Sequence, residues 1–335
     1  MKPTFKIVYV LVSNNEDYYY EQLLLSATSL RKKMPNVEVF AMVDEETENY
    51  LNTRKNSWES LINQLIIVSV PNELSPKERS RWLKTSMRKH IEGDFLFIDC
   101  DTIIVEDLSD IANLDIDLGA VLDCHFNKKY LLNINKYKEM FRRTDELLNF
   151  HLSLPELNYF NSGVIFCRDT EQNHIFFDEW YKLWKLSSSA GIVTDQQSFY
   201  EANYNLNGVI KELDGKWNCT LWLSASINYL SSSHIIHCFK TGYFSENLYL
   251  LAEQSVFEEI RKNGITDKIE KMLDNPRAAF SENARIMNYP QITDKLDRNI
   301  DNLSLKTIFK IAIKRILGIF FEVSMVQCKF FKKKF

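Results

Sequence analysis

Glycine is scarce in this chain, which has only 9 glycines among 335 residues, where an average composition would give roughly 23. No two glycines are closer in sequence than Gly208 and Gly215. The glycine-rich loops GxGxxG and GxxxxGK[ST] therefore cannot occur anywhere in the sequence. A bound nucleotide would have its phosphates neutralised by a metal ion and by side chains, because no glycine-rich backbone cradle is present.

The chain also lacks paired cysteines and long apolar runs. None of its six cysteines belongs to a CxxC pair, which predicts reduced, buried thiols. The apolar run 7–12 is short for a signal sequence and has no cleavage site of small residues, so we interpret it as a buried strand. No run approaches the 18 or so residues of a membrane-spanning helix. These absences lead us to expect a cytoplasmic protein.

Neither sign of charge dominates, since 41 basic and 45 acidic residues give a net charge of -4. A dedicated nucleic-acid-binding protein carries a strong basic excess, so nucleic acid is not an expected partner. Apolar residues make up 45% of the chain and charged residues 26%, as is typical of folded, soluble proteins.

One segment departs from this balance, because residues 303–335 carry eight basic residues against Glu322 alone, a local charge of +7. Ile308, Ala312 and Ile316 follow helical spacing within it. A basic amphipathic helix suits an anionic membrane surface. We therefore expect a tail over 301–335 that holds the protein peripherally on the cytoplasmic face of a membrane, with packing of the tail on the main domain as the alternative.

Short apolar runs alternate with helical stretches from residue 7 to about 125, as in βαβ units of a mostly parallel sheet. The first four strands are expected at 7–13, 37–43, 65–70 and 95–99, each buried on both faces. Later strands are expected at 118–123, 160–167, 208–213 and 235–239. Segment 126–158 is interpreted as an insertion or lid, and 246–274 as helical. We expect an α/β domain over 1–245, a helical extension over 246–300 and the basic tail over 301–335.

Two carboxylates, Asp99 and Asp101, follow the apolar strand 95–98. If the chain stays extended, both project to the same side at the carboxyl end of a strand, where open α/β sheets bind ligands. Carboxylates without other hard ligands suit Mg²⁺ or Mn²⁺ bridging a diphosphate. The structural alternative is that Asp99 caps a turn and Asp101 is solvated.

Two classes of enzyme use this local chemistry. In haloacid-dehalogenase-type phosphatases, an apolar strand followed by DxDxT supplies a nucleophilic aspartate, and residues 95–102 fit that pattern with Asp99 as the nucleophile. That motif normally opens its domain, whereas three βα units precede it here. The phosphatase stays an alternative, as does a sugar-nucleotide-binding protein without turnover.

Four motifs in sequence order resemble those of the metal-dependent GT-A glycosyltransferases, in particular family eight, the group of glycogenin and the bacterial lipooligosaccharide galactosyltransferases. They are Asp99-x-Asp101, Phe160-Asn161-Ser162-Gly163-Val164, Thr194-Asp195-Gln196 and His237, within a resemblance that covers residues 5 to about 243. It implies an α/β GT-A fold with a mixed, mostly parallel sheet flanked by helices and a C-terminal helical extension. It also implies transfer of a hexose from UDP-glucose or UDP-galactose to a cell-surface glycan or glycolipid, with retention of configuration.

The same resemblance implies roles for individual residues. Asp99, Asp101 and His237 would bind Mn²⁺ or Mg²⁺, which assists departure of the diphosphate. Asp123, Asp195 and Gln196 would lie at the transferred sugar, and Trp217-Asn218 near the acceptor. Contacts with the UDP-sugar are implied for a larger set: Ser13, Asn14, Tyr19, Arg81, Lys84, Asp99, Cys100, Asn161, Ser162, Lys240 and Gly242.

Three of these donor contacts are basic residues. Arg81 and Lys84 share one face of the expected helix with Arg88, at spacings of three and seven residues from Arg81. The family usually continues His-Phe-x-Gly-x-x-Lys after its histidine, whereas this chain has the order Lys240 then Gly242. Lys240 is our candidate partner for the diphosphate.

Overall fold

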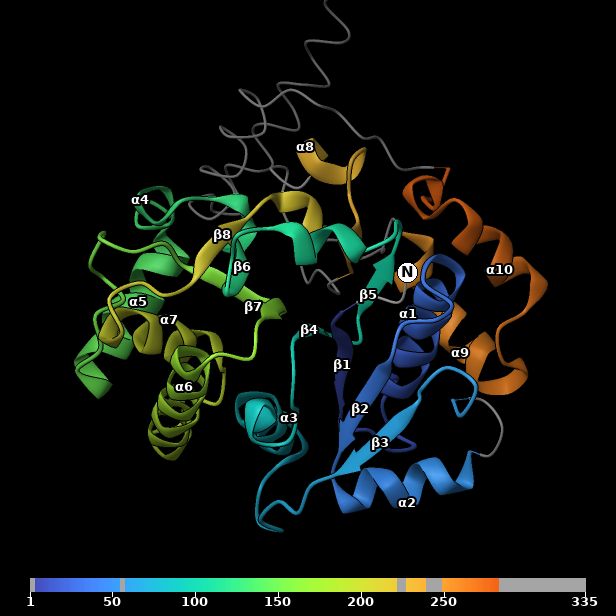
Figure 1. The fold of residues 1–335 in the computed structure, drawn as a ribbon, viewed down its shortest axis with the longest axis horizontal. Helices are drawn as coiled ribbons and strands as arrows, with labels where there is room; N and C mark the ends of the chain where they lie inside the picture. The colour runs from blue at the N-terminus through green and yellow to red at the C-terminus, as the bar shows by residue number, and fades with distance from the viewer. Residues whose placement is uncertain (1–3, 55–57, 222–226, 239–248, 283–335) are drawn as a thin grey trace, which may run out of the picture.

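A seven-stranded mixed sheet lies at the centre of the computed structural model, which describes residues 4–54, 58–221, 227–238 and 249–282. The strand order is β3-β2-β1-β4-β7-β6-β8 (Figure 1). β7 pairs antiparallel with β4 and β6, and the other pairs are parallel. The strands are β1 (Lys6–Leu11), β2 (Val39–Val43), β3 (Gln64–Ile67), β4 (Phe95–Ile98), β6 (Leu118–Leu122), β7 (Phe160–Cys167) and β8 (Lys211–Leu213). The predicted mixed, mostly parallel sheet is confirmed.

A second sheet of three short strands has the order β5-β10-β9. Its strands are β5 (Thr102–Ile104), β9 (Cys219–Thr220) and β10 (Ile235–His237). β10 runs antiparallel to β5 and pairs His237 with Thr102, which brings a late part of the chain next to the Asp99–Asp101 segment. The sequence analysis missed β5 and β9, because runs of three and two residues are too short to show a periodicity.

Helices cover both faces of the large sheet, and the buried side chains form two apolar clusters, one on each face. The helices are α1 (Tyr19–Lys33), α2 (Glu45–Thr53), α3 (Pro76–Ser86), α4 (Lys128–Leu131), α5 (Asn135–Leu148), α6 (Glu171–Ser189), α7 (Gln196–Asn205), α8 (Ile227–Leu230), α9 (Gln254–Asn263) and α10 (Asp267–Asp274). α3 begins at the expected place, with Pro76 as its first residue. Ser75 precedes it as the N-cap and forms a capping box with Glu78. Among the described residues, no helix combines the length and apolar character that crossing a bilayer requires.

Burial of the strands follows their place in the sheet. β1 and β4 are central, and their residues contribute to both apolar clusters. β3 is an edge strand, and Ile67 is 46% exposed, so the prediction that the third strand is buried on both faces is wrong. Parallel edge strands keep one side uncovered even when their sequence is apolar. Most predicted strands are also one to three residues too long, and segment 126–158 contains the helices α4 and α5.

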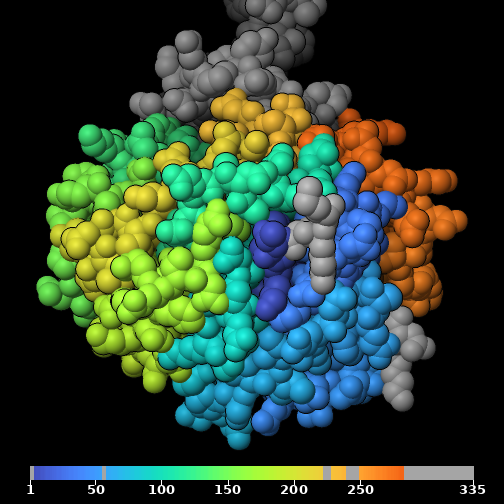
Figure 2. Space-filling model, viewed as in Figure 1, coloured from blue at the N-terminus to red at the C-terminus, as the bar shows by residue number. Residues whose placement is uncertain are grey.

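The described part of the C-terminal extension packs against α1 through a buried ion pair. Glu21 is fully buried and accepts from Arg261, with Nε 2.8 Å from Oε1. The Arg261 guanidinium also lies over the Tyr18 ring, 4.4 Å from its centroid. Figure 2 shows the orange α9–α10 surface adjoining the blue surface of the N-terminal segment. The single helical stretch predicted for 246–274 is two helices, separated at Gly264 (φ 73°). The expected tail 301–335 lies outside the described residues.

Candidate functional site

The polar side chains singled out in the sequence converge where the carboxyl end of β4 meets the start of β7. The Asp99 N–H donates to the Gly163 carbonyl at 2.8 Å, which ties the end of one strand to the other. The chain then turns at Cys100-Asp101, so the extended geometry expected there is wrong. Asp99, Asp101 and His237 nevertheless each place one ligand atom within 4.8 Å of the others.

Glycine is required at position 163 by this close approach. A Cβ on Gly163 would lie 2.3 Å from Cε1 of His237 and 2.8 Å from Oδ2 of Asp99. Both distances are shorter than van der Waals contact, so any side chain here would displace one of the three candidate ligands. One of the few glycines in the chain therefore stands where the backbone of β7 lines the site.

The donor set of two carboxylates and one imidazole fits a divalent cation such as Mn²⁺ or Mg²⁺. Nε2 of His237 lies 3.0 Å from Oδ1 of Asp101. Burial alone would lower the pKa of His237, but the Asp101 carboxylate outweighs it and raises that pKa. Burial likewise would raise the pKa of Asp101, and His237 reverses the direction and lowers it. The pKa of Asp99 is raised by burial, with Lys84 opposing.

Two cations of α3 neutralise carboxylates at this site. Nζ of Lys84 lies 3.2 Å from Oδ1 of Asp99 and 3.4 Å from Oδ2 of Asp195. Nε of Arg81 lies 2.8 Å from Oδ1 of Asp195, and Ser162 donates its hydroxyl to Oδ2 of Asp195 at 2.7 Å. Burial would raise the pKa of Asp195, but Lys84 and Arg81 lower it well below its usual range. Two fixed cations, Lys84 and Arg81, thus face the carboxylates of Asp99 and Asp195, while Asp101 faces His237.

Arg88, the third basic residue of the same helical stripe, points elsewhere. It donates to the Gly93 carbonyl at 2.8 Å and pairs with Asp169 at 3.3 Å. Arg88 therefore holds the loop before β4 and does not belong to the cluster. Helical spacing alone could not separate it from Arg81 and Lys84.

A chain of hydrogen bonds leads from His237 to the end of β6. Nδ1 of His237 lies 2.9 Å from Oδ1 of Asn218, and Asn218 donates through Nδ2 to Oδ1 of Asn161 at 2.9 Å. Asn161 in turn donates through Nδ2 to Oδ1 of Asp123 at 3.1 Å. The Tyr137 hydroxyl from α5 donates to Oδ2 of Asp123 at 2.6 Å. Tyr137 carries no motif, and the sequence analysis missed it.

The turn that follows Asp123 is strained. Cys124 (φ 52°) and His125 (φ 58°) are two consecutive non-glycine residues in the left-handed region. Such conformations cost of order 1–3 kcal/mol each and persist where the surroundings enforce them, often at functional sites. The His125 ring is held by Tyr229, with ring centroids 4.7 Å apart. The strain fixes the direction in which β6 delivers Asp123.

The loop after β1 is organised by Asp17, a residue that the sequence analysis did not single out. Asp17 accepts from the Ser13 hydroxyl at 2.6 Å, from the Asn14 N–H at 3.1 Å and from the Tyr19 N–H at 3.0 Å. Ser13 is buried, whereas the Tyr19 side chain is 56% exposed and near enough to Arg81 to contribute, after the aspartates of the site, to the raised pKa of that arginine. Tyr19 is thus an exposed ring beside the site.

The remaining candidates divide into three groups. Gln196 begins α7 and lies against the hydroxyl of Tyr159, beside Asp195. The Cys100 thiol is turned toward the Val10 carbonyl, 3.3 Å away, so its side chain faces the core. Lys240 and Gly242 lie outside the described residues.

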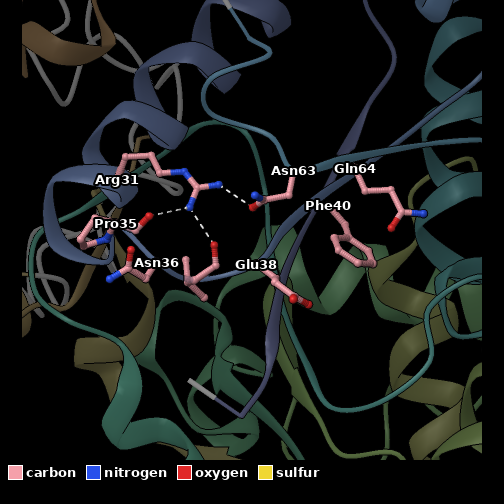
Figure 3. A pocket seen from close by; sticks show the side chains of 8 residues that line it. Arg31, Pro35, Asn36, Glu38, Phe40, Asn63 and Gln64 are labelled. Atoms are coloured by element: carbon pink, nitrogen blue, oxygen red, sulfur yellow. Dashed lines mark hydrogen bonds between the residues drawn. The ribbon is translucent and has the colours of Figure 1, made fainter. Parts of the chain in front are cut away.

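Two hollows on the surface differ in their relation to this site. The larger, about 880 Å³, lies at the amino end of β2, and Arg31 donates there to the Pro35 and Val37 carbonyls and to Asn63 (Figure 3). Those contacts hold the α1–β2 connection, at the end of the sheet away from Asp99.

The smaller hollow, about 530 Å³, adjoins Asp195 through Thr194 and Gln197. Its wall includes three basic residues, Lys77 from α3 and Arg142 and Arg143 from α5. This hollow is thus next to the acid–amide pair 195–196 along the chain, and neither member of the pair lines it.

The mixed sheet and the acidic site at the carboxyl end of β4 are those of a GT-A-type α/β enzyme. A family model for glycosyl transferase family 8 matches residues 10–242. The chain therefore belongs to glycosyl transferase family 8 and is a glycosyltransferase. The predicted family and enzyme class are confirmed, and the family membership decides against the phosphatase alternative.

Solved glycosyltransferases are similar to this chain at low identity, and the search of curated proteins finds no match. Mouse xyloside xylosyltransferase 1 is 12% identical, with a TM-score of 0.46 over 71% of this chain and 97% of its own. The galactosyltransferase LgtC, in complex with donor and acceptor sugar analogs, is 14% identical, with a TM-score of 0.46 over 81% and 99%. GlyE of Streptococcus pneumoniae TIGR4 is 13% identical, with a TM-score of 0.47 over 84% and 66%.

Proposed function

We propose that this glycosyltransferase moves a hexose from UDP-glucose or UDP-galactose to a glycan or glycolipid of the cell surface, with Mn²⁺ or Mg²⁺ as cofactor. The observation that carries the proposal is the convergence of Asp99, Asp101 and His237 within 4.8 Å. A divalent cation held there supplies Lewis acidity to the departing diphosphate. Family membership adds the nucleotide sugar as the class of donor.

Lys84 and Arg81 support a role at the diphosphate. Lys84 lies between Asp99 and Asp195 and is 2% exposed, so its charge acts in a poorly solvated site where electrostatic stabilisation is strong. Arg81 lies at the more exposed edge beside Tyr19. We assign these two cations to the phosphate oxygens, with the Tyr19 ring available to the nucleobase.

The sugar is assigned to the side of the site formed by Asp123, Asn161, Asp195 and Gln196. Both carboxylate oxygens of Asp195 are already paired, with Arg81 and with Lys84 and Ser162. Because a paired carboxylate of lowered pKa is a weak nucleophile, the proposed retention of configuration does not proceed through a covalent intermediate on Asp195. Its role is to hold the two cations in place.

The acceptor is assigned to the 530 Å³ groove that adjoins Thr194 and Gln197. Thr194 and Gln197 flank the pair Asp195-Gln196 in the sequence, so an acceptor bound there would lie near the chain segment assigned to the sugar. The C-terminal tail, with its local charge of +7, is proposed to attach the enzyme peripherally to the cytoplasmic face of an anionic membrane. Such an attachment would bring lipid-linked acceptors to the groove.

A donor panel tests the proposal. Purified protein is incubated with UDP-, GDP-, ADP- and CMP-sugars, with and without Mn²⁺, and nucleotide release is measured for the wild type and for Asp101→Asn. We expect release from a UDP-hexose that needs both the metal and Asp101. Asp115→Asn, at an exposed aspartate, is the matched control and keeps full activity. Tight UDP-sugar binding without release, even with acceptor glycans present, would instead identify a non-catalytic binding protein.

A further inference from the structure

We infer that Asn218 and Asn161 form a relay that fixes the tautomer of His237, so that its Nε2 is presented to the metal, and that joins the metal site to Asp123. The inference rests on the proposed metal-dependent function and adds two positioning residues to it. Asn218 contacts His237 at Nδ1, and Asn161 contacts Asn218, so both act through the histidine.

The direction of every hydrogen bond in the relay is set by one backbone group. The Gly163 N–H, which can only donate, lies 2.9 Å from Asn161, so the atom of Asn161 that faces it is the oxygen. The amide group of Asn218 that faces this same oxygen, at 2.9 Å, must then be the nitrogen. Asn218 is left with its oxygen toward His237.

The histidine has one arrangement that satisfies this partner. Because an amide oxygen only accepts, Nδ1 of His237 must carry a hydrogen to donate to Asn218 over 2.9 Å. Nε2 is then the nitrogen left for a metal ion; with no metal bound it donates to Asp101 over 3.0 Å. Metal-binding histidines commonly have their second nitrogen held by such a partner, which sets both the tautomer and the ring orientation.

Burial makes the relay difficult to replace by water. Asn218 and His237 have no exposed surface, and Asn161 is 5% exposed. The other end of the relay is also closed, since Asn161 donates to Asp123 and Tyr137 donates to the second oxygen of Asp123. Two amides thereby connect His237 to the Asp123 carboxylate on the proposed sugar side. The family resemblance implies a position near the acceptor for Asn218, whereas the relay makes Asn218 a residue that positions His237.

The test uses Asn218→Leu, which keeps most of the side-chain volume and removes both hydrogen bonds. Mn²⁺ affinity is measured on the full-length protein by electron paramagnetic resonance, without donor. We expect Mn²⁺ to bind about 10- to 100-fold more weakly than in the wild type.

Asn173→Leu is the matched control. Asn173 is an equally buried amide that donates to the Asp117 and Arg168 carbonyls, at 2.9 Å each, beyond the far end of β7. Its loss is expected to lower stability and leave Mn²⁺ affinity unchanged. If Asn218→Leu does not fold, Asn218→Ser is read in the same way, because its hydroxyl is too short to bridge the two partners.

The outcomes separate this inference from the function on which it rests. Wild-type affinity for Mn²⁺ in the folded variant would overturn the relay and leave the metal site standing. Absence of Mn²⁺ binding in the wild type itself would refute the proposed metal dependence, and the relay with it.

Discussion

Two buried lysines, equal in burial, have opposite surroundings. Lys84 is 2% exposed at the candidate metal site and lies 3.2 Å and 3.4 Å from the carboxylates of Asp99 and Asp195. Lys128 is 1% exposed at the start of α4, and its Nζ has no hydrogen-bond partner. Aromatic rings surround it instead, with centroids of Tyr200, Phe141 and Tyr159 at 3.7, 4.3 and 5.3 Å.

The difference shows what a buried charge is used for in each region. At the metal site, carboxylates and cations compensate one another and remain charged in a place where a diphosphate would need them. In the aromatic cage around Lys128, burial lowers the pKa to about 7, and Asp145, Glu156 and Glu201 oppose this only from a distance. At the candidate metal site the charged side chains are available to a ligand. In the aromatic cage the fold accommodates a lysine whose pKa is close to neutral pH.

The largest expected effect is on activity, in Lys84→Met. Removal of this cation leaves two carboxylates without their shared partner, and kcat/KM for nucleotide release should fall about 100- to 1,000-fold. The unfolding free energy should also fall, by about 3 kcal/mol, because a buried pair is broken from one side. Steady-state kinetics and urea unfolding measure the two quantities.

The same assay on Lys128→Met sharpens the comparison. If the aromatic cage is only structural, kcat/KM stays within about fivefold of the wild type, since Lys128 contacts none of the candidate ligands. An equal loss of activity in both variants would contradict the division between the two regions.

The next effect is on stability, again in Lys128→Met. The pKa of Lys128 falls from 10.5 in the unfolded chain to about 7 in the fold. Between these values the unfolded state binds more protons, so the lysine's contribution to stability rises with pH, by about 1.4 kcal/mol per unit. Methionine has no such contribution, so the variant should be at least as stable as the wild type at pH 7. Its advantage should shrink by about 2 kcal/mol at pH 9.

Urea unfolding at the two pH values checks this sign, because groups that titrate alike in both proteins cancel in the difference. Lys129→Met, at the exposed neighbouring lysine, is the control and should show no pH-dependent difference. A gap that is the same at pH 7 and at pH 9 would mean that Lys128 stays charged throughout and that the rings stabilise its charged form.

The candidate metal ligands were predictable from the sequence, but most of the residues that support them were not. Asp99, Asp101 and His237 could be found because a short motif follows an apolar strand and because the family pattern includes the histidine. Lys128 could not, since a lysine in a segment rich in lysine and tyrosine gives no sign of its burial. Tyr137 and Asp17 were also missed. The partner of Tyr137 is distant in sequence, and the partners of Asp17 lie in an irregular loop. The mixed, mostly parallel sheet was predictable from the sequence. The strand ends, the short strands β5 and β9 and the exposure of β3 were not, because they depend on tertiary pairing.

The smallest expected effect concerns Tyr19. Its aromatic ring is exposed near a cation, whereas the rings around Lys128 enclose one. Its ring is 56% exposed and close to Arg81, so an incoming nucleobase could stack on it without displacing a packed side chain. Tyr19→Ala should raise KM for the donor about 3- to 10-fold with kcat unchanged, as expected for loss of one stacking contact of about 1 kcal/mol. Tyr19→Phe keeps the ring and should match the wild type. If Tyr19→Phe raises KM for the donor as much as Tyr19→Ala does, the hydroxyl and not the ring makes the contact. The aromatic rings at Tyr19 and around Lys128 would then have unrelated roles.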